Sequence, residues 1–322
     1  MSTTAQPTMG LTDVSRLATT VETNILEVVE GKADVVRLTL VALLAEGHLL
    51  IEDVPGVGKT MLAKALARSI DCTVSRVQFT PDLLPSDVTG VTVYSPDTGQ
   101  FRFKPGPVFS NIVLGDEINR AGPKTQSALL EAMEERTVTI DGQTHVLGRP
   151  FLVIATQNPI ELEGTYPLPE AQRDRFMMRL SIGYPDVESE LDILRTHGKG
   201  DPLDALTPVT DAARVADAVV AVRAVHCAPN VERYIVAVCR ATRSHPEVEL
   251  GASPRASLAL LRACRAWAAL ERREYVVPDD VKVLARHVLP HRLILRPDAQ
   301  LADRDPLNVV EEVLDGVPAP TE

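Results

Sequence analysis

The residues with the clearest chemistry lie in segment 52–60, which reads Glu-Asp-Val-Pro-Gly-Val-Gly-Lys-Thr. The segment follows an apolar run at 49–51 and precedes a stretch with helical spacing of apolar residues at 61–70. A strand, a glycine-containing turn and a helix that opens with Lys-Thr form a phosphate cradle, because backbone N–H groups and the helix dipole face the anion. We therefore predict phosphate binding by Asp53, Val54, Pro55, Gly56, Val57, Gly58, Lys59, Thr60 and Met61.

Lys59 strengthens this prediction, because a cation in the first turn of a helix is unfavourable unless an anion lies beside it. A β- or γ-phosphate would supply that anion, and the Thr60 hydroxyl would then ligate Mg²⁺. The strict pattern asks for glycine six residues before Lys59, where this chain has Asp53, but Gly56 and Gly58 can still form the turn. The alternative is an ordinary glycine-rich connection between a strand and a helix.

Two carboxylates and an amide follow later apolar strands. Asp116 and Glu117 end the run at 111–117, and Asn158 comes just past the run at 151–156. The carboxyl ends of parallel strands are where such folds bind ligands. There Asp116 can hold Mg²⁺ through water, Glu117 can act as general base, and Asn158 can orient the attacking water. Without the phosphate loop they would be an acidic strand exit and a turn residue before proline.

Two arginines are further candidates. Arg175 follows a short polar helix, where an arginine is either a surface charge or a finger that neutralises transition-state charge in a neighbouring subunit's site. Arg255 follows Ser253 and Pro254, a helix start with Ser as cap and Pro at the first position. A cation in that first turn again suggests a nearby anion, although an exposed arginine there is only weakly disfavoured.

The composition indicates an ordinary globular protein of about two domains, with 322 residues, a net charge of −11 and a pI near 5.2. An acidic chain is a poor default candidate for nucleic-acid binding. Its four cysteines show no Cys-x-x-Cys spacing and are expected to be buried, reduced thiols. The start of the chain does not resemble a secretory signal, and no apolar run approaches the ~20 residues of a membrane span. We expect a cytoplasmic location.

The order of elements predicts two regions. Residues 1–10 are expected to be a disordered tail, 11–190 an α/β core and 191–322 a helical domain without further buried strands. In the core, helices are expected at 14–30, 35–46 and 123–135, with Gly47 ending the second. Strands are expected at 49–51, 74–79, 111–117, 151–156 and 177–182, and hairpins at 91–103 and 137–147. The first hairpin either closes the core or meets a partner. His245, His287 and His291 show no spacing typical of metal ligands.

Taken together, these residues resemble an AAA+ ATPase and, within that superfamily, a MoxR-type ATPase. The resemblance spans about residues 21–295. Besides the phosphate loop, it rests on Gly-Asp-Glu-Ile-Asn-Arg-Ala at 115–121, Lys-Thr-Gln-Ser-Ala-Leu-Leu-Glu-Ala-Met at 124–133, Ala-Thr-Gln-Asn-Pro at 155–159, Leu-Pro-Glu-Ala-Gln at 168–172, Asp-Arg-Phe at 174–176 and Gly-Ala-Ser-Pro-Arg-Ala at 251–256.

The resemblance implies a P-loop core with a five-stranded parallel sheet, a helix-2 insert hairpin, a hairpin before sensor 1, and a helical lid. It implies that Lys59 and Thr60 are Walker A residues, Asp116 and Glu117 Walker B, Asn158 sensor 1, Arg175 the arginine finger and Arg255 sensor 2. Arg173 departs from the expected aliphatic residue, which leaves open which arginine is the finger. Whether Arg255 acts within its own subunit or on a neighbour is also open.

The implied activity is hydrolysis of ATP, with Mg²⁺, in a homo-oligomeric ring, most simply a hexamer. ATP would lie between core and lid, and the hairpins would contact a client protein. MoxR-like proteins resemble chaperones that mature other complexes, often with a partner that carries a von Willebrand factor A domain. The alternatives are a nucleic-acid motor of the same superfamily, which the net charge disfavours, and a nucleotide-binding scaffold with little turnover, which Asp116 and Glu117 disfavour.

Overall fold

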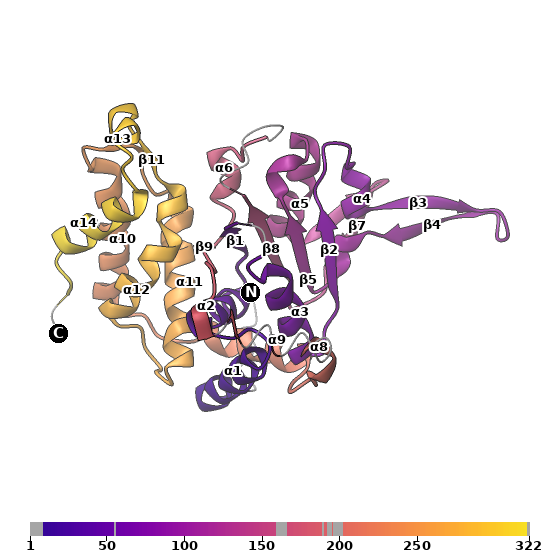
Figure 1. The fold of residues 1–322 in the computed structure, drawn as a ribbon, viewed down its shortest axis with the longest axis horizontal. Coiled ribbons are helices and arrows are strands. Elements are labelled where there is room, and N and C mark those ends of the chain that lie inside the picture. The colour runs from indigo at the N-terminus through magenta and orange to yellow at the C-terminus, as the bar shows by residue number, and fades with distance from the viewer. Residues whose placement is uncertain are drawn as a thin grey trace, which may run out of the picture.

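The computed structural model describes residues 9–54, 56–158, 166–188, 190–191, 195 and 202–320. Most of the expected tail and Pro55 of the phosphate loop lie outside these residues. A five-stranded parallel sheet of order β2-β5-β8-β1-β9 forms the centre of the core, as predicted (Figure 1). Its strands are β1 (Leu49–Glu52), β2 (Val74–Gln78), β5 (Ile112–Asp116), β8 (Leu152–Gln157) and β9 (Met178–Leu180).

Helices cover both faces of this sheet, which explains why its central strands are apolar throughout. Alternate residues of β1 point to opposite faces: Leu49 and Ile51 join one apolar cluster, and Leu50 joins the other. The first cluster contains α1 (Leu11–Leu26), α2 (Ala33–Leu44) and α3 (Lys59–Ser69), and the second contains α5 (Pro123–Glu135). The short helices α4 (Pro85–Thr89) and α6 (Glu170–Arg173) complete the core region.

The prediction that Gly47 ends the second helix was wrong in detail. The helix ends at Leu44, and Glu46 takes the left-handed conformation with φ 53°. The Gly47 N–H then donates to the Ala42 carbonyl at 2.8 Å. Gly47 is needed instead for packing, because a side chain there would overlap Met177.

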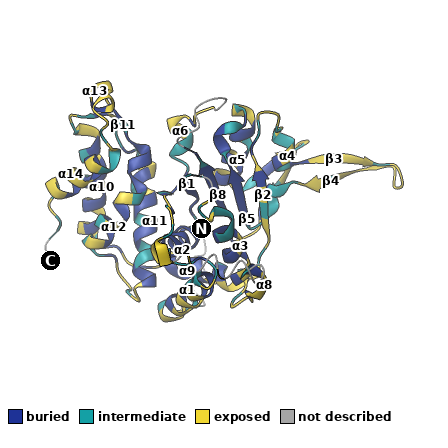
Figure 2. Cartoon of the chain, viewed as in Figure 1, coloured by how far each residue is buried: buried dark blue, intermediate teal, exposed yellow. Residues whose placement is uncertain are grey.

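Both predicted hairpins are present. The first pairs β3 (Gly90–Ser95) with β4 (Gln100–Pro105) and projects far from the body (Figure 1). Figure 2 shows that most of it is exposed. At its base a side chain on Gly90 or Gly106 would collide with backbone atoms of the facing strand, so both positions require glycine. The second hairpin pairs β6 (Thr137–Ile140) with β7 (Gln143–Val146).

The C-terminal region forms a helical domain at the far end of the molecule from the β3–β4 hairpin. Its helices include α10 (Pro229–Ser244), α11 (Pro254–Leu270), α12 (Pro278–Val288), α13 (Pro297–Leu301) and α14 (Pro306–Gly316), preceded by α8 (Pro202–Ala205) and α9 (Ala212–Arg223). The prediction concerned buried apolar strands, and the two short strands of this region, β10 (Val248–Leu250) and β11 (Ile294–Leu295), which pair antiparallel, are only partly buried. No helix in the described part of the chain is long and apolar enough to cross a membrane.

Ser253 caps α11 as predicted, because its hydroxyl accepts a hydrogen bond from the Ala256 N–H at 3.3 Å. The same hydroxyl donates to Asp174 of the core at 2.8 Å. Asp174 is also bound by Arg292, whose Nε lies 2.8 Å from the carboxylate. The start of α11 is therefore fastened to the core at the segment that precedes β9.

Candidate nucleotide-binding site

A cavity of about 200 Å³ lies at the carboxyl ends of β1, β5 and β8. It brings together seven of the predicted residues: Gly56, Gly58, Lys59, Thr60, Asp116, Glu117 and Asn158. They come from segments up to 102 positions apart in the chain. Among the described residues, all those that line this cavity belong to the core, and none comes from the C-terminal helices.

The phosphate loop has the backbone that its glycines predict. Gly56 and Gly58 take φ angles of 87° and 93°, which strain any residue with a side chain. The loop delivers Lys59 and Thr60 as the first residues of α3, whose N–H groups therefore face the cavity. The Lys59 ammonium donates to the Asp53 carbonyl at 2.9 Å. Burial lowers the pKa of Lys59, while Asp53, Asp116 and Glu117 oppose that shift.

The Asp53 side chain has another task. Its carboxylate accepts hydrogen bonds from the backbone N–H groups of Ile182 and Gly183, at 2.5 and 2.8 Å, and from the Ser181 hydroxyl at 3.1 Å. It thus holds the chain that leaves β9 against the start of the phosphate loop. This tether is a physical reason for an acid where the strict pattern has glycine. Asp53 does not line the cavity. The same holds for three other residues that were predicted to bind phosphate, namely Val54, Val57 and Met61.

The two carboxylates of β5 lie across the cavity from Lys59. Asp116 is buried, and its Oδ1 is 3.3 Å from the Thr156 hydroxyl. Glu117 takes a left-handed conformation with φ 57°, and its N–H donates to the same hydroxyl at 2.9 Å. Thr156 of β8 therefore fixes the turn that places both carboxylates at the end of the strand.

Strand β2 supplies two residues that the sequence analysis missed. The Arg76 guanidinium lies 2.6 Å from Asp116, and the Gln78 amide donates to Glu117 at 2.8 Å. Arg120 adds a second cation, 3.2 Å from Glu117. Residues 76 and 78 are two apart in a strand beside β5, so they share one face of the sheet. The sequence alone does not show that β2 lies beside β5, so it carried no signal for these two residues.

These contacts test whether the cavity suits Mg²⁺ and a triphosphate. Hard divalent cations prefer oxygen ligands, and Asp116 and Thr60 offer a carboxylate and a hydroxyl in one cavity. Arg76 already places a positive charge against Asp116, the position that a metal ion would take. The glycine turn and the amino end of α3 offer N–H donors to phosphate oxygens. The residues fit both groups.

Arg175 and Arg255 do not reach this cavity. Both line a second cavity of about 290 Å³, between the core and α11. There they share one carboxylate: Arg175 Nε lies 3.2 Å from Glu134, and Arg255 is also paired with Glu134. Arg173 does not line this cavity, and its Nε is buried without a hydrogen-bond partner among the described residues.

The two cavities lie at opposite edges of the sheet. The second is lined by Gly47 and His48, which precede β1, and by Glu134 at the end of α5. A helix of 13 residues is about 20 Å long at 1.5 Å per residue, and α5 starts close to the Asp116 edge. An arginine side chain cannot span that distance. The expectation that ATP lies between core and lid of one chain is therefore not met by this arrangement.

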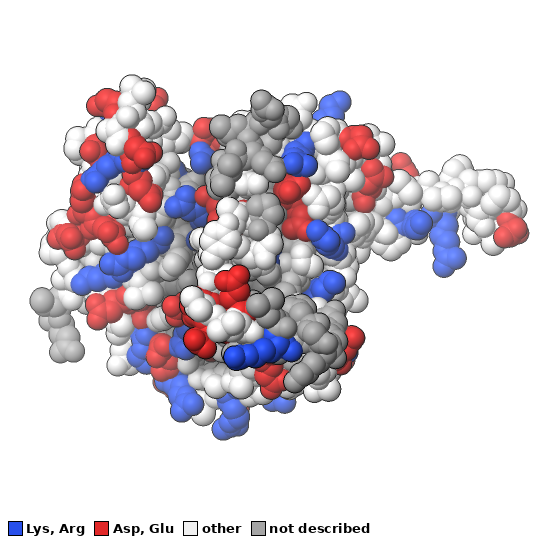
Figure 3. Space-filling view, in the orientation of Figure 1, with Lys and Arg blue, Asp and Glu red and all other residues white. Residues whose placement is uncertain are grey.

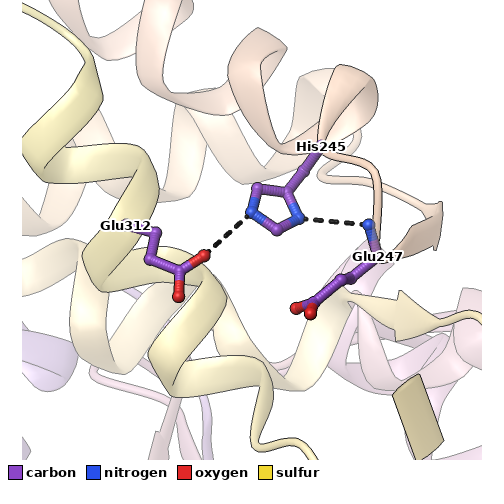
Figure 4. Close-up of side chains that lie close together, drawn as sticks. All are labelled: His245, Glu247 and Glu312. Carbon is purple, nitrogen blue, oxygen red and sulfur yellow. Dashed lines mark hydrogen bonds and ion pairs between the residues drawn. The ribbon is translucent and has the colours of Figure 1, made fainter.

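His245 takes part in a cluster that the sequence did not reveal (Figure 4). Its Nε2 is 3.2 Å from Glu312, and its Nδ1 accepts from the Glu247 N–H at 3.3 Å. Three such side chains could hold a metal ion, but Arg304 already pairs with both carboxylates. We interpret the cluster as an ion-paired network that joins β10 to α14.

A P-loop after β1, two acidic residues at the end of β5, with β8 between these strands, and a helical domain after the core define an AAA+ type of ATPase fold. The chain matches the family described as "ATPase family associated with various cellular activities (AAA)" over residues 48–178 and the AAA lid domain over residues 240–313. AAA+ ATPases generally bind ATP with Mg²⁺ and are typically oligomeric.

Individual proteins resemble the chain over nearly its whole length. It is 44% identical to "Chaperone MoxR1" of Mycobacterium tuberculosis, over 94% of this chain and 82% of the relative. It is 33% identical to "Protein MoxR" of Methylorubrum extorquens, over 96% and 97%. A crystal structure of a Cytophaga hutchinsonii protein superposes with a TM-score of 0.91 at 38% identity and covers 97% of both chains. The chain belongs to the MoxR family of AAA+ ATPases.

Proposed function

We propose that this protein hydrolyses ATP to ADP and phosphate and uses the reaction to remodel or mature a client protein complex. The observation that carries the proposal is the convergence of Lys59, Thr60, Asp116, Glu117 and Asn158 on one cavity at the carboxyl edge of the sheet. A phosphate cradle alone would bind nucleotide. The carboxylates opposite the cradle add the groups that hydrolysis needs.

Each residue has a defined task in this reaction. Lys59 and the N–H groups at the start of α3 bind the phosphate oxygens, and Thr60 and Asp116 hold Mg²⁺. The metal ion, when bound, neutralises charge on the phosphates. Glu117 accepts the proton of the attacking water, and Asn158 orients that water against the γ-phosphate. Gln78 and Arg120 hold the Glu117 carboxylate, so they set where the base points.

The second cavity completes the site of a neighbouring copy. Because Arg175 and Arg255 lie at the opposite edge of the sheet from their own phosphate loop, we propose that both act in trans. Contact between unlike faces of identical chains gives a ring when the rotation between neighbours closes, and we propose such a ring, most simply a hexamer. In the isolated chain Glu134 pairs with both arginines and keeps them side by side.

The β3–β4 hairpin is the element best placed to meet a client. It carries exposed apolar side chains, of which Phe101 is 75% and Tyr94 52% exposed, and their rings pack edge to face at 5.3 Å. Figure 3 shows few charged groups on this projection. We propose that it contacts the client, with a von Willebrand factor A domain protein as an additional partner.

The free cysteines fit a reducing compartment, and we propose a cytoplasmic location.

The test is ATP hydrolysis by the purified chain and by three variants. Glu117→Gln is expected to bind ATP but to lose turnover by roughly 100-fold or more, since it removes the general base. Lys59→Ala is expected to lose binding as well. Glu249→Gln, an exposed glutamate far along the chain, is the matched control and should retain the rate. Unchanged turnover in Glu117→Gln would show that the base has been misassigned, and stimulation by nucleic acid would favour a motor.

A further inference from the structure

The cavity that holds Arg175 and Arg255 continues into a larger one. The larger cavity has a volume of about 540 Å³ and shares Glu46, Glu134, Arg136 and Arg262 with the cavity of about 290 Å³. Together the two cavities present a surface that we call the arginine wall. In a chain with a net charge of −11 it combines three carboxylates with eight arginines: Arg136, Arg149, Arg175, Arg223, Arg255, Arg262, Arg265 and Arg292.

The carboxylates cannot neutralise these arginines. Glu46 pairs with both Arg136 and Arg223, and Glu134 pairs with both Arg175 and Arg255. Asp174 is already bound by Arg292, the most buried member of the wall. Three arginines, Arg149, Arg262 and Arg265, make no ion pair or hydrogen bond with any residue of the described segments. The wall therefore carries an excess of positive charge.

This excess has a cost within the folded chain. Burial lowers the pKa of the Arg136 guanidinium, and the nearby charges of Arg149 and Arg262 lower it further. The Nε of Arg265 is buried and has no hydrogen-bond partner among the described residues. Like charges that are crowded and partly withdrawn from water become favourable only when an anion lies between them.

Helix α11 carries both a predicted site residue, Arg255, and an arginine of the wall that was not predicted, Arg262. Arg255 and Arg262 are seven residues apart, about two turns, so they project from the same face of the helix. Arg262 lines both cavities, and it therefore lies between the Arg175–Arg255 pair and Arg149. The wall is continuous from the core segment before β9 to the segment before β8.

We propose that Arg262 and Arg149 contact, together with Arg175 and Arg255, the triphosphate bound by the adjacent copy of this chain. The inference rests on the proposed function, because it needs ATP at the phosphate loop of that copy. A triphosphate carries several negative charges in a small volume, which suits cavities of this size better than a broad acidic protein surface does. The chain's own triphosphate is excluded, since its phosphate loop is at the opposite edge of the sheet.

The experiment compares Arg262→Ala and Arg149→Ala with Arg240→Ala, an exposed lid arginine outside the wall. Sedimentation measures self-association with and without Mg²⁺-ATP, and hydrolysis is measured per subunit. We expect both wall variants to lose ATP-dependent assembly. We also expect them to hydrolyse ATP at roughly one tenth of the wild-type rate or below, because each loses a charge-assisted contact. A fluorescent ATP analogue should bind dilute, unassembled subunits of every variant as tightly as it binds the wild type. Arg262→Lys should recover part of the loss.

The outcomes separate this inference from the proposed function. Wild-type turnover together with unchanged assembly and turnover in both wall variants would overturn the inference and leave the function standing. Equal loss of assembly with and without ATP would show that the wall meets an acidic protein surface, which also overturns it. If the wild type neither binds nor hydrolyses ATP, the proposed function fails and the inference falls with it. Thermal unfolding confirms that each variant is folded.

Discussion

Asp53 shows how one side chain can support the phosphate loop through hydrogen bonds to other parts of the protein. Its carboxylate accepts three hydrogen bonds from residues 181–183, and only its carbonyl faces Lys59. Arg76 is a comparable case on β2, since it neutralises Asp116 from outside the recognised motifs. At the scale of single residues, the geometry of the site depends on hydrogen-bond and ion-pair partners outside the motifs as much as on the motif residues themselves.

We expect Asp53→Ala to act mainly on stability. The substitution leaves the buried N–H of Ile182 and its neighbour at Gly183 without an acceptor, which costs about 2–6 kcal/mol at 1–3 kcal/mol for each unsatisfied group. Urea unfolding of the nucleotide-free protein measures this loss. Asp53→Asn keeps one acceptor oxygen and should lose less. A stability equal to that of the wild type, combined with weaker ATP binding, would instead place the carboxylate at the phosphates.

His48 predicts a loss of stability in mild acid. Burial lowers its pKa to about 4, and its ring nitrogens contact the Met133 carbonyl and the Val153 N–H. Below pH 6.5 the unfolded chain takes up a proton that the folded chain refuses, so stability is present above that pH and falls toward pH 4. The loss is about 3.5 kcal/mol at 1.4 kcal/mol per pH unit. His291, whose pKa burial also lowers, adds to the effect.

Urea unfolding at pH 7 and pH 5 measures this dependence. His48→Gln should lower stability at pH 7, because it disturbs two buried hydrogen bonds, but should weaken the fall between the two pH values. An equally steep fall in that variant would mean that other groups are responsible.

The sequence predicted the residues whose chemistry is written in a local pattern. Lys59, Thr60, Asp116, Glu117 and Asn158 follow strands or open a helix, and parallel strands necessarily bring those ends together. Arg76 and Gln78 carry no such pattern, because polar residues that alternate along a strand are ordinary. Their function depends on which strand lies next to β2, and strand order is decided by the whole fold.

At the scale of elements, the β3–β4 hairpin combines a fixed base with an exposed end. Gly90 and Gly106 let the two chains approach closely where the hairpin leaves the core. Beyond them, Phe101 and Tyr94 contact each other and are 75% and 52% exposed, so their removal should not weaken the fold.

We expect the double substitution Tyr94→Ser and Phe101→Ser to change stability by less than about 0.5 kcal/mol, since exposed positions rarely contribute more. Basal ATP hydrolysis should also be retained. Proteins that co-purify with the Glu117→Gln variant should be lost when both substitutions are added. Val146→Ser, an exposed apolar residue of the other hairpin, is the matched control. Retention of the same proteins without the two aromatic rings would exclude this hairpin as the contact.

Element prediction succeeded where the apolar pattern was long. The prediction for α5 agrees with the observed Pro123–Glu135, and each of the five sheet strands was predicted within two residues at its ends. Strands β10 and β11 are three and two residues long, too short for a periodic signal. They exist because the lid helices bring them together.

At the scale of the molecule, the position of the lid was the feature that the sequence could not give. A helical lid was predicted, although without α13 and α14, but its docking beside β9 depends on contacts such as Ser253 with Asp174 and Arg292 with Asp174. These contacts join residues 79 to 118 positions apart. With the lid docked there, none of the described residues that line the phosphate-loop cavity comes from the lid, which is why we propose that the arginine wall meets another copy.

A mixture of two inactive variants tests this arrangement. Arg175→Ala subunits keep an intact phosphate loop, and Lys59→Ala subunits keep the arginine. Each should be nearly inactive alone, because loss of an arginine finger costs roughly 1,000-fold or more. If Arg175 acts in trans, mixed assemblies regain part of the ATP hydrolysis. No recovery at any mixing ratio would count against it.

The double attachment of Asp53 has one consequence for energetics. Its carbonyl holds Lys59, and its carboxylate holds the chain that leaves β9. A phosphate that takes Lys59 away from that carbonyl changes the balance at both ends of the residue. Such coupling is reciprocal: if nucleotide binding changes how firmly residues 181–183 are held, then displacing residues 181–183 changes the nucleotide affinity by the same factor. A mechanical force on residues 181–183 would then change the affinity of the site for ATP.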